Sequence, residues 1–205
     1  MTALWRVPEP LTLASGSAAR RMLLEAAGIP LTVLKTEVNE GKIAAQCIAD
    51  RAQPIEIAAT LASAKAEAAV RLAPGALILA ADQVLDFNGE LFSKPESVEA
   101  ARTQLTRLAG KSHRLHAAAV LRRGSETIWT GTATATLVMR MVSADFITAY
   151  LDIAGEDVTT TVGGYKLEGL GIHLFERIEG EHATILGLPL LPLLAALRDA
   201  GYLSA

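Results

Sequence analysis

The stretch ALILAADQVLDF, residues 76–87, is apolar at every position up to Asp82. An uninterrupted run of this kind predicts a strand that is buried on both faces at the centre of a sheet. Asn88-Gly89 follows it and is a strong signal for a two-residue hairpin. An acid at this place must be paired, bind a metal or face a cleft, because burying a bare carboxylate is costly. Asp82 is therefore the first candidate functional residue, although a turn-forming aspartate is the simpler alternative.

The rest of the chain alternates between helical and extended patterns around this strand. Apolar periodicity, caps and Gly/Pro stops predict helices over 18–27, 54–72, 97–109, 143–155 and 189–201. Strands are predicted over 11–14, 31–38, 113–123, 126–141 and 172–178, the last turning at Glu179-Gly180 and returning near 183–188. Residues 39–53 and the glycine-rich 162–171 are predicted to be loops. Long crossovers mixed with hairpins indicate a mixed α/β protein with a mixed sheet.

Composition limits the class of protein. The chain has 205 residues, 51% hydrophobic and 20% charged, which suits one globular domain or two closely joined lobes. The formal net charge of −3 argues against a general nucleic-acid binder. A single cysteine, Cys47, excludes an internal disulfide and fits a reducing cytoplasm. We find neither a signal-peptide pattern nor an apolar run of the ~18–20 residues that a membrane span needs.

The segment LASGSAARR, residues 13–21 with the preceding Leu11-Thr12, passes from a strand through small hydroxyl residues into a helix. Ser15, Ser17, Arg20 and Arg21 stand there, where backbone N–H groups and the helix dipole favour an anion. A capped helix with two solvated arginines is the alternative.

Further charged residues stand at the edges of predicted elements. Glu37 and Glu40, in TEVNEG, could share a hard divalent cation with Asp82, or could form an ordinary charged loop. Lys65 lies at the edge of an apolar helix stripe, and Lys94 precedes a proline. Both lysines could bind phosphate oxygens or be solvated charges.

The glycine-rich loop carries Tyr165, Lys166 and Glu168, and its glycines permit close approach to a flat or anionic ligand. An irregular connection is the alternative. His113 and His116, at i and i+3 on a strand, should face opposite sides, and no Cys/His spacing suggests zinc. Separate acids for Mg²⁺ and separate cations for phosphate oxygens indicate attack by water on a nucleotide phosphoanhydride.

Several ordered motifs resemble the Maf family of septum-formation Maf-like nucleotide pyrophosphatases. LASGSAARR resembles its Ser-x-Ser-Pro-Arg-Arg opening, EVNE its Val-Asp-Glu segment and KAEAAV its Lys-Ala helix. AADQVL, SKPES, GKSH and the segment from AGEDV to GLPL are similar to further family motifs. The resemblance runs from about residue 11 to 203.

The resemblance implies a two-lobed mixed α/β fold, related to inosine-triphosphatase-like enzymes, in a single domain over 1–205 with a central cleft. Residues 1–10 are expected to be a loose N-terminal extension. The resemblance also implies hydrolysis of a nucleoside triphosphate to monophosphate and pyrophosphate with Mg²⁺ or another divalent cation such as Mn²⁺. The family often forms homodimers, so a homodimer is expected, with neither nucleic acid nor a membrane as a partner. Roles carried over by position give three catalytic residues, Asp82 as the general base with Glu40 and Lys65, and give Asp82 and Glu40 as the metal ligands. Triphosphate contacts are expected from Ser15, Arg20, Lys65 and Lys94.

Ala19, Gln83 and Glu168 occupy the positions at which the family reads the base. Subgroups acting on dTTP and UTP have Arg, Thr and Gln there, whereas ADQV and YKLEGLGI resemble the subgroup acting on 7-methyl-GTP. A carboxylate such as Glu168 would accept from the N1–H and N2–H₂ donors of 7-methylguanine. The chain departs from that subgroup at Ala18-Ala19, where a Pro-Trp pair is usual, and from the family at Asn39, where aspartate is usual.

Three hypotheses follow. The leading one is a house-cleaning pyrophosphatase for a modified nucleotide such as 7-methyl-GTP. The second is a dTTP- or UTP-preferring pyrophosphatase of the same family. The third belongs to another class, a non-catalytic nucleotide-binding regulator of cell division, to which the departures at Asn39 and Ala18-Ala19 point.

Overall fold

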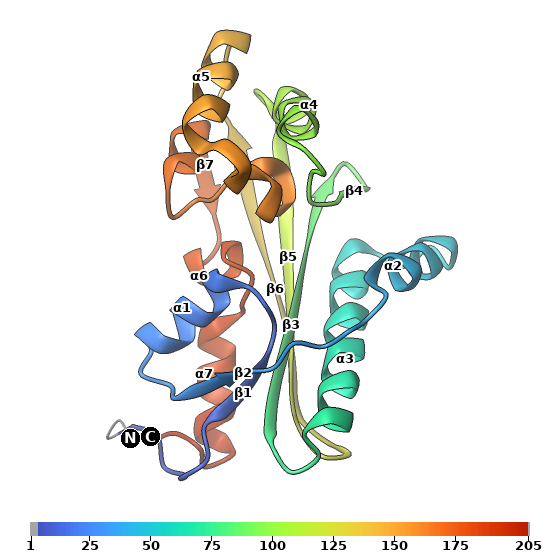
Figure 1. The fold of residues 1–205 in the computed structure, drawn as a ribbon, viewed down its shortest axis with the longest axis vertical. Helices are drawn as coiled ribbons and strands as arrows, with labels where there is room; N and C mark the ends of the chain where they lie inside the picture. The colour runs from blue at the N-terminus through green and yellow to red at the C-terminus, as the bar shows by residue number, and fades with distance from the viewer. Residues whose placement is uncertain (1–3, 205) are drawn as a thin grey trace.

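The computed structural model describes residues 4–204 and contains one seven-stranded mixed sheet with helices on both faces (Figure 1). The strands run in the order β2-β1-β3-β5-β6-β7, with β4 paired to β3 beside this path. Their bounds are β1 Leu11–Ala14, β2 Leu31–Val33, β3 Leu77–Phe87, β4 Glu90–Phe92, β5 Ser112–Arg123, β6 Glu126–Met139 and β7 Phe175–Glu179. The α-helices are α1 Ala18–Ala26, α2 Glu40–Ala49, α3 Pro54–Leu72, α4 Val98–Leu108, α5 Ala144–Ala154, α6 His182–Ile185 and α7 Leu190–Asp199. Three 3₁₀ segments complete the set, η1 Gly155–Thr160, η2 Val162–Gly164 and η3 Leu170–Leu174. The mixed α/β fold class predicted from the sequence is confirmed.

The long strands β3, β5 and β6 run the length of the molecule and join its lower and upper parts (Figure 1). In the lower part, α1 and α7 cover one face of the sheet and α3 covers the other (Figure 1). Alternation along β3 explains this arrangement, because Leu77 and Leu79 face α1 and α7 while Ile78 and Ala80 face α3. In the upper part, α4 and α5 bury a third apolar cluster against the same strands.

The edge of β3 is open over a short interval between these two parts. β1 pairs with β3 as far as Ala80, and β4 begins its pairing at Leu85. Among the residues described, none forms a strand beside Ala81 to Val84 on that side, although β5 pairs with them on the other side. In open α/β sheets ligands bind where neighbouring strands diverge in this way.

Most predicted elements are present with nearly the expected bounds, and several predictions were wrong. Residues 39–53, expected to be a loop, contain α2, which Asn39 caps by accepting from the N–H of Lys42 at 2.9 Å. α2 has no buried residue and rests on α3 through Ile43, Ala44 and Cys47, a stripe too short to give a clear apolar period. The strand expected over 31–38 ends at Val33.

The C-terminal region also differs from the prediction. The strand expected over 172–178 begins at Phe175, after a 3₁₀ turn, and the return near 183–188 is the short helix α6 instead of a strand. Gly180, at a φ of +124°, permits the reversal between them.

The N-terminal segment is docked where it is described, contrary to the expectation of a loose extension; residues 1–3 lie outside the described part. Trp5 is 4% exposed, forms an isolated bridge with Leu203 and stacks on Tyr202 at 6.2 Å between ring centroids. Its indole N–H donates to the carbonyl of Glu9 at 3.0 Å, so the polar atom of the buried ring is satisfied.

Candidate active site

Asp82 lies on β3 within the open interval of the strand edge, and its side chain points to the face covered by α3. Lys65, on α3, places its Nζ 2.5 Å from Asp82 Oδ1 and 3.0 Å from Glu40 Oε1. Glu40 is the first residue of α2, so three elements distant in sequence meet at one ammonium group. The side chains of Asp82 and Lys65 are 9% and 12% exposed, whereas that of Glu40 is 54% exposed. The cluster is thus open to solvent on the Glu40 side.

The environment of Asp82 sets opposing effects on its proton affinity. Burial raises the pKa of Asp82, while the charges of Lys65 and Arg20 lower it and that of Glu40 raises it. Burial dominates, so the net pKa is raised above the usual value. A carboxylate with a raised pKa, next to solvent, is suited to accept a proton from water near neutral pH.

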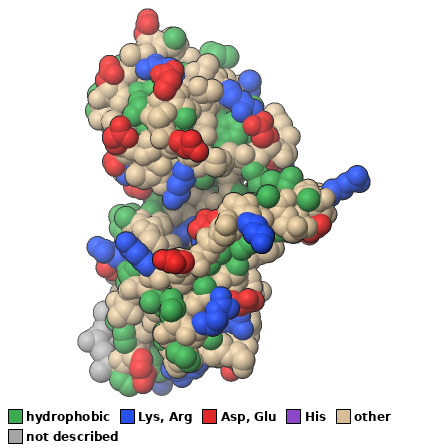
Figure 2. All heavy atoms as spheres, turned by 45° about the vertical axis from the view of Figure 1, so that its right-hand side comes forward, with side chains coloured by type: hydrophobic (Ala, Val, Ile, Leu, Met, Phe, Trp, Pro, Cys, Tyr) green, Lys and Arg blue, Asp and Glu red, His purple; other side chains and the backbone are tan. Residues whose placement is uncertain are grey.

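Figure 2 shows a hollow at the waist of the molecule, beside the projecting arm that α2 forms, with acidic and basic side chains around it. The Asp82–Lys65–Glu40 cluster lies where α2, α3 and the open interval of β3 meet, and it is exposed on the Glu40 side.

The N-terminus of α1 stands on the other side of this edge. Ser17 caps the helix by accepting from the N–H of Arg20 at 3.3 Å, and Ser15 Oγ accepts from the N–H of Ser17 at 3.3 Å. The N–H groups of Gly16, Ala18 and Ala19 make no hydrogen bond to another residue of 4–204. These donors and the helix dipole provide an anion site.

Arg20, expected to bind phosphate, uses its guanidinium largely within the protein. Nε donates to the carbonyl of Gly187 at 2.8 Å, and Nη1 donates to Ser15 Oγ and to the carbonyl of Ala81, both at 2.9 Å. Burial lowers its pKa, while the nearby Asp82 and Glu40 raise it. Arg20 therefore joins three segments at the open edge, and Gly187 has φ of +92° with Arg20 atoms 3.0 Å from where a Cβ would lie.

Gln83 points to the opposite face from Asp82. Its amide Nε2 donates to the carbonyls of Thr184 and Ile185, each at 2.9 Å, and so attaches α6 to β3. No sequence pattern indicates these α6 contacts, because their acceptors are backbone carbonyls that any residue type supplies.

The remaining predicted site residues form no hydrogen bond or ion pair with the cluster among residues 4–204. Lys94 is exposed between β4 and α4, Glu168 is exposed between η2 and η3, and neither forms an ion pair with the part of the chain described. Ala19 is half-buried in the first turn of α1. The histidines do face opposite sides as predicted, since His113 contacts Tyr165 and His116 contacts Thr134.

The family model described as Maf-like protein matches residues 10–200. This chain belongs to the Maf-like family. Its similarity to curated Maf-like relatives extends over nearly its full length. A protein of Nitrobacter hamburgensis is 44% identical over 202 residues, covering 98% of this chain and 99% of that protein.

Two further relatives agree. A protein of Rhodopseudomonas palustris strain HaA2 is 47% identical, with 96% of each chain covered. A protein of Jannaschia sp. is 47% identical, covering 93% of this chain and 96% of that protein. The first two relatives carry the name nucleoside triphosphate pyrophosphatase, and the third is named nucleoside triphosphate pyrophosphatase 1.

Asp82 and Glu40 are the candidate metal ligands of this site. Within residues 4–204, no group of three or more His, Cys, Asp or Glu side chains is arranged to hold a metal ion. Asp82 and Glu40 are two carboxylates that share one lysine, and Mg²⁺ in proteins is often held by one or two carboxylates together with substrate phosphates. The donor set thus fits a metal that binds together with a triphosphate.

Among the helices of residues 4–204, none has the length and apolar character to cross a membrane.

Proposed function

We propose that this Maf-like protein is a nucleoside triphosphate pyrophosphatase, an enzyme that hydrolyses a nucleoside triphosphate to its monophosphate and pyrophosphate. The observation that carries the proposal is the buried Asp82 paired with Lys65 at the open edge of β3, next to the exposed Glu40. The names of the full-length relatives support the same activity.

In the proposed mechanism, Asp82 accepts the proton of the attacking water as the water oxygen bonds to the α-phosphorus. The bond from the α-phosphorus to the oxygen that bridges it to the β-phosphate breaks, and pyrophosphate leaves with that oxygen. Lys65 holds the carboxylate in place and balances its charge. The N–H groups at the start of α1, together with Ser15 and Lys94, bind the triphosphate oxygens. Arg20 acts as a positioning residue, because its guanidinium holds Ser15 Oγ and the carbonyl of Ala81 in place through hydrogen bonds.

We further propose Mg²⁺, or Mn²⁺ in its place, as the cofactor, held by Asp82 and Glu40. When bound, a divalent cation would neutralise charge that develops on the phosphate oxygens. To hold the cation, each carboxylate must direct an oxygen to it that does not contact Lys65. Glu40 is exposed, so its side chain has room to reorient.

For the base we propose 7-methylguanine, because Glu168 is exposed and keeps its acceptor oxygens available. The second candidate within this activity is a preference for dTTP or UTP. A separate candidate is nucleotide binding without turnover, favoured by Asn39, whose side chain caps α2 where a carboxylate would add a metal ligand. We also propose that the protein forms a homodimer and is located in the cytoplasm. Light scattering in solution tests the homodimer.

The test is a product assay on a panel of 7-methyl-GTP, GTP, dTTP, UTP and ATP, with Mg²⁺ and with a chelator. We expect monophosphate and pyrophosphate in equal amounts, with 7-methyl-GTP hydrolysed fastest and activity lost with the chelator. Release of diphosphate and inorganic phosphate, or binding of nucleotide without any product, would contradict the proposed activity.

A further inference from the structure

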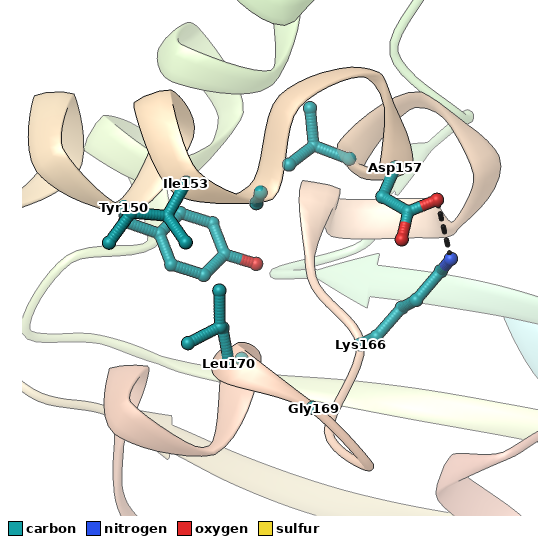
Figure 3. Close-up of a pocket in the computed structure, with 9 residues that line it drawn as sticks. Tyr150, Ile153, Asp157, Lys166, Gly169 and Leu170 are labelled. Atoms are coloured by element: carbon teal, nitrogen blue, oxygen red, sulfur yellow. Dashed lines mark ion pairs between the residues drawn. The ribbon is translucent and has the colours of Figure 1, made fainter.

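A second concave site lies in the upper part of the molecule, away from the Asp82 cluster. It is a pocket of about 200 Å³ between the end of α5, η1 and the segment 166–171 (Figure 3). None of the residues that line it belongs to the proposed hydrolytic mechanism. Its lining is uneven, apolar on one side and charged on the other.

The apolar side consists of the side chains of Tyr150, Ile153 and Leu170, which lie together in Figure 3. Ile153 is 71% exposed and Leu170 is 41% exposed, so both aliphatic side chains offer surface at the pocket. Tyr150 is buried and donates its hydroxyl to the carbonyl of Gly164 at 3.2 Å, which fixes the orientation of its ring. A flat apolar ligand placed here would cover two aliphatic groups that now face water.

The charged side consists of Asp157 and Lys166, opposite the aliphatic residues in Figure 3. Lys166 Nζ lies 3.0 Å from Asp157 Oδ1. The other carboxylate oxygen, Oδ2, makes no hydrogen bond within the described residues 4–204. An ammonium donor and a free carboxylate acceptor thus stand next to each other at the edge of an apolar hollow.

The loop that carries Lys166 is held in place before any ligand binds. The N–H groups of Gly169 and Gly171 both donate to the carbonyl of Lys166, at 3.2 and 3.0 Å. A Cβ on Gly171 would lie 2.4 Å from that carbonyl oxygen, so this close turn requires glycine. Backbone hydrogen bonds therefore fix the main chain at Lys166, which lowers the cost of ordering this loop on binding.

We propose that this pocket binds one planar ring that carries an N–H next to a C=O, the lactam edge present in uracil, hypoxanthine and guanine. The ring C=O accepts from Lys166, the adjacent N–H donates to Asp157 Oδ2, and the ring faces lie against Ile153 and Leu170. The size agrees, since an apolar cavity of about 150 Å³ holds benzene. A ring whose lactam nitrogen carries a methyl group, as in 1-methylinosine or 3-methyluridine, keeps the C=O for Lys166 but has no ring N–H to donate to Asp157.

The test uses two matched pairs of nucleosides, inosine with 1-methylinosine and uridine with 3-methyluridine, without phosphate or metal. Each is titrated into the full chain while the methyl signals of Ile153 and Leu170 are followed by NMR. We expect inosine and uridine to shift both signals and to saturate, with at least tenfold weaker binding of the two methylated nucleosides. Equal shifts with all four nucleosides, or no shift at millimolar concentration, would overturn the proposal.

Variants locate the interaction. Asp157→Ala should weaken inosine binding at least tenfold, whereas Asp152→Ala, an exposed residue of α5 outside the pocket, should leave it unchanged. Asp157 is exposed, so its loss should not unfold the chain, and unchanged methyl signals elsewhere verify this. Retained inosine binding by Asp157→Ala would contradict the assignment. Signals of Ile153 and Leu170 that change with protein concentration alone would also do so, because a second copy would then cover the pocket.

The ring can come from a free nucleoside or from the substrate itself. In the first case Asp157→Ala leaves pyrophosphate release unchanged, and in the second it raises KM with little change in kcat. The nucleoside titration does not depend on the proposed hydrolysis. If the protein released no pyrophosphate but bound inosine, only the proposed hydrolysis would be contradicted. If it released pyrophosphate but bound no nucleoside, only the proposed pocket would be contradicted.

Discussion

Asp82 and Gln83 are consecutive residues of β3, yet their side chains bind to elements on opposite faces of the sheet. Asp82 meets Lys65 of α3 at 2.5 Å, and Gln83 donates to two carbonyls of α6 at 2.9 Å. The alternation of a strand produces this divergence. Asp82, the proposed proton acceptor, therefore lies on one face of the sheet. The segment 184–187, which accepts hydrogen bonds from Arg20 and Gln83, is bound from the other face.

Replacing Lys65 by methionine removes the ammonium that links Asp82 and Glu40. Lys65 is the strongest of the charges that lower the pKa of Asp82, so this pKa should rise further. Because Asp82 must be ionised to accept a proton, the acidic limb of the pH–rate profile should move to higher pH. We expect kcat to fall by about 10²–10⁴. Lys35→Met, at an exposed position, is the control, and an unmoved acidic limb in Lys65→Met would count against the pairing.

Replacing Arg20 by methionine should destabilise the protein more than it changes substrate affinity. Its loss leaves the carbonyls of Ala81 and Gly187 without their donor, at a cost of about 2–4 kcal/mol in unfolding free energy. The neighbouring Arg21 is exposed and, among residues 4–204, forms an ion pair with Glu25 alone, so Arg21→Met should cost less than about 0.5 kcal/mol. Urea unfolding measures both, and equal stability of the two variants would contradict the structural role of Arg20.

Glu168→Gln tests how the base is read. Glu168 is exposed and forms no ion pair within residues 4–204, so the change should leave the unfolding free energy unaltered. Loss of a charged acceptor should lower kcat/KM for 7-methyl-GTP relative to dTTP by about 10-fold or more. Glu176→Gln, at another exposed position, serves as the control. An unchanged ratio would favour the pyrimidine-preferring alternative.

His113 predicts how stability depends on pH. It is 2% exposed, its Nε2 lies 2.7 Å from the hydroxyl of Tyr165, and burial lowers its pKa from 6.5 to about 4. The unfolded chain therefore binds this proton more readily, and the contribution present above pH 6.5 is lost as the pH falls towards 4. The full effect is about 3 kcal/mol. In His113→Gln, the unfolding free energy should fall less between pH 7 and pH 4.5 than in the unaltered protein, and an equal fall would contradict this account.

The sequence predicted those parts of the fold that depend on local signals. The apolar run before Asp82, the Asn88-Gly89 hairpin and the cap at Ser17 each follow from residue types at adjacent positions. Lys65 was recognisable from its place at the edge of an apolar stripe, and the structure shows it paired with Asp82.

Other parts depend on contacts that carry no local signal. The carbonyls of Gly187, Thr184 and Ile185 accept from Arg20 and Gln83, and backbone acceptors leave no trace in residue type. α2 was missed because its contact with α3 is short, and α6 was missed because one helical turn cannot be told from a strand by periodicity. The docking of Trp5 depends on Tyr202 and Leu203 at the far end of the chain.

The central claim is that Asp82 accepts the proton of the water that cleaves the triphosphate. The most direct measurement is the single-turnover rate of pyrophosphate release by Asp82→Asn and by the unaltered protein, on the preferred nucleotide of the panel. Asparagine keeps the size of the side chain and a hydrogen-bond acceptor for Lys65, so folding should be retained and circular dichroism verifies this. The account predicts a rate at least about 10²-fold lower for Asp82→Asn with nucleotide binding retained. Equal rates for the two proteins would contradict it.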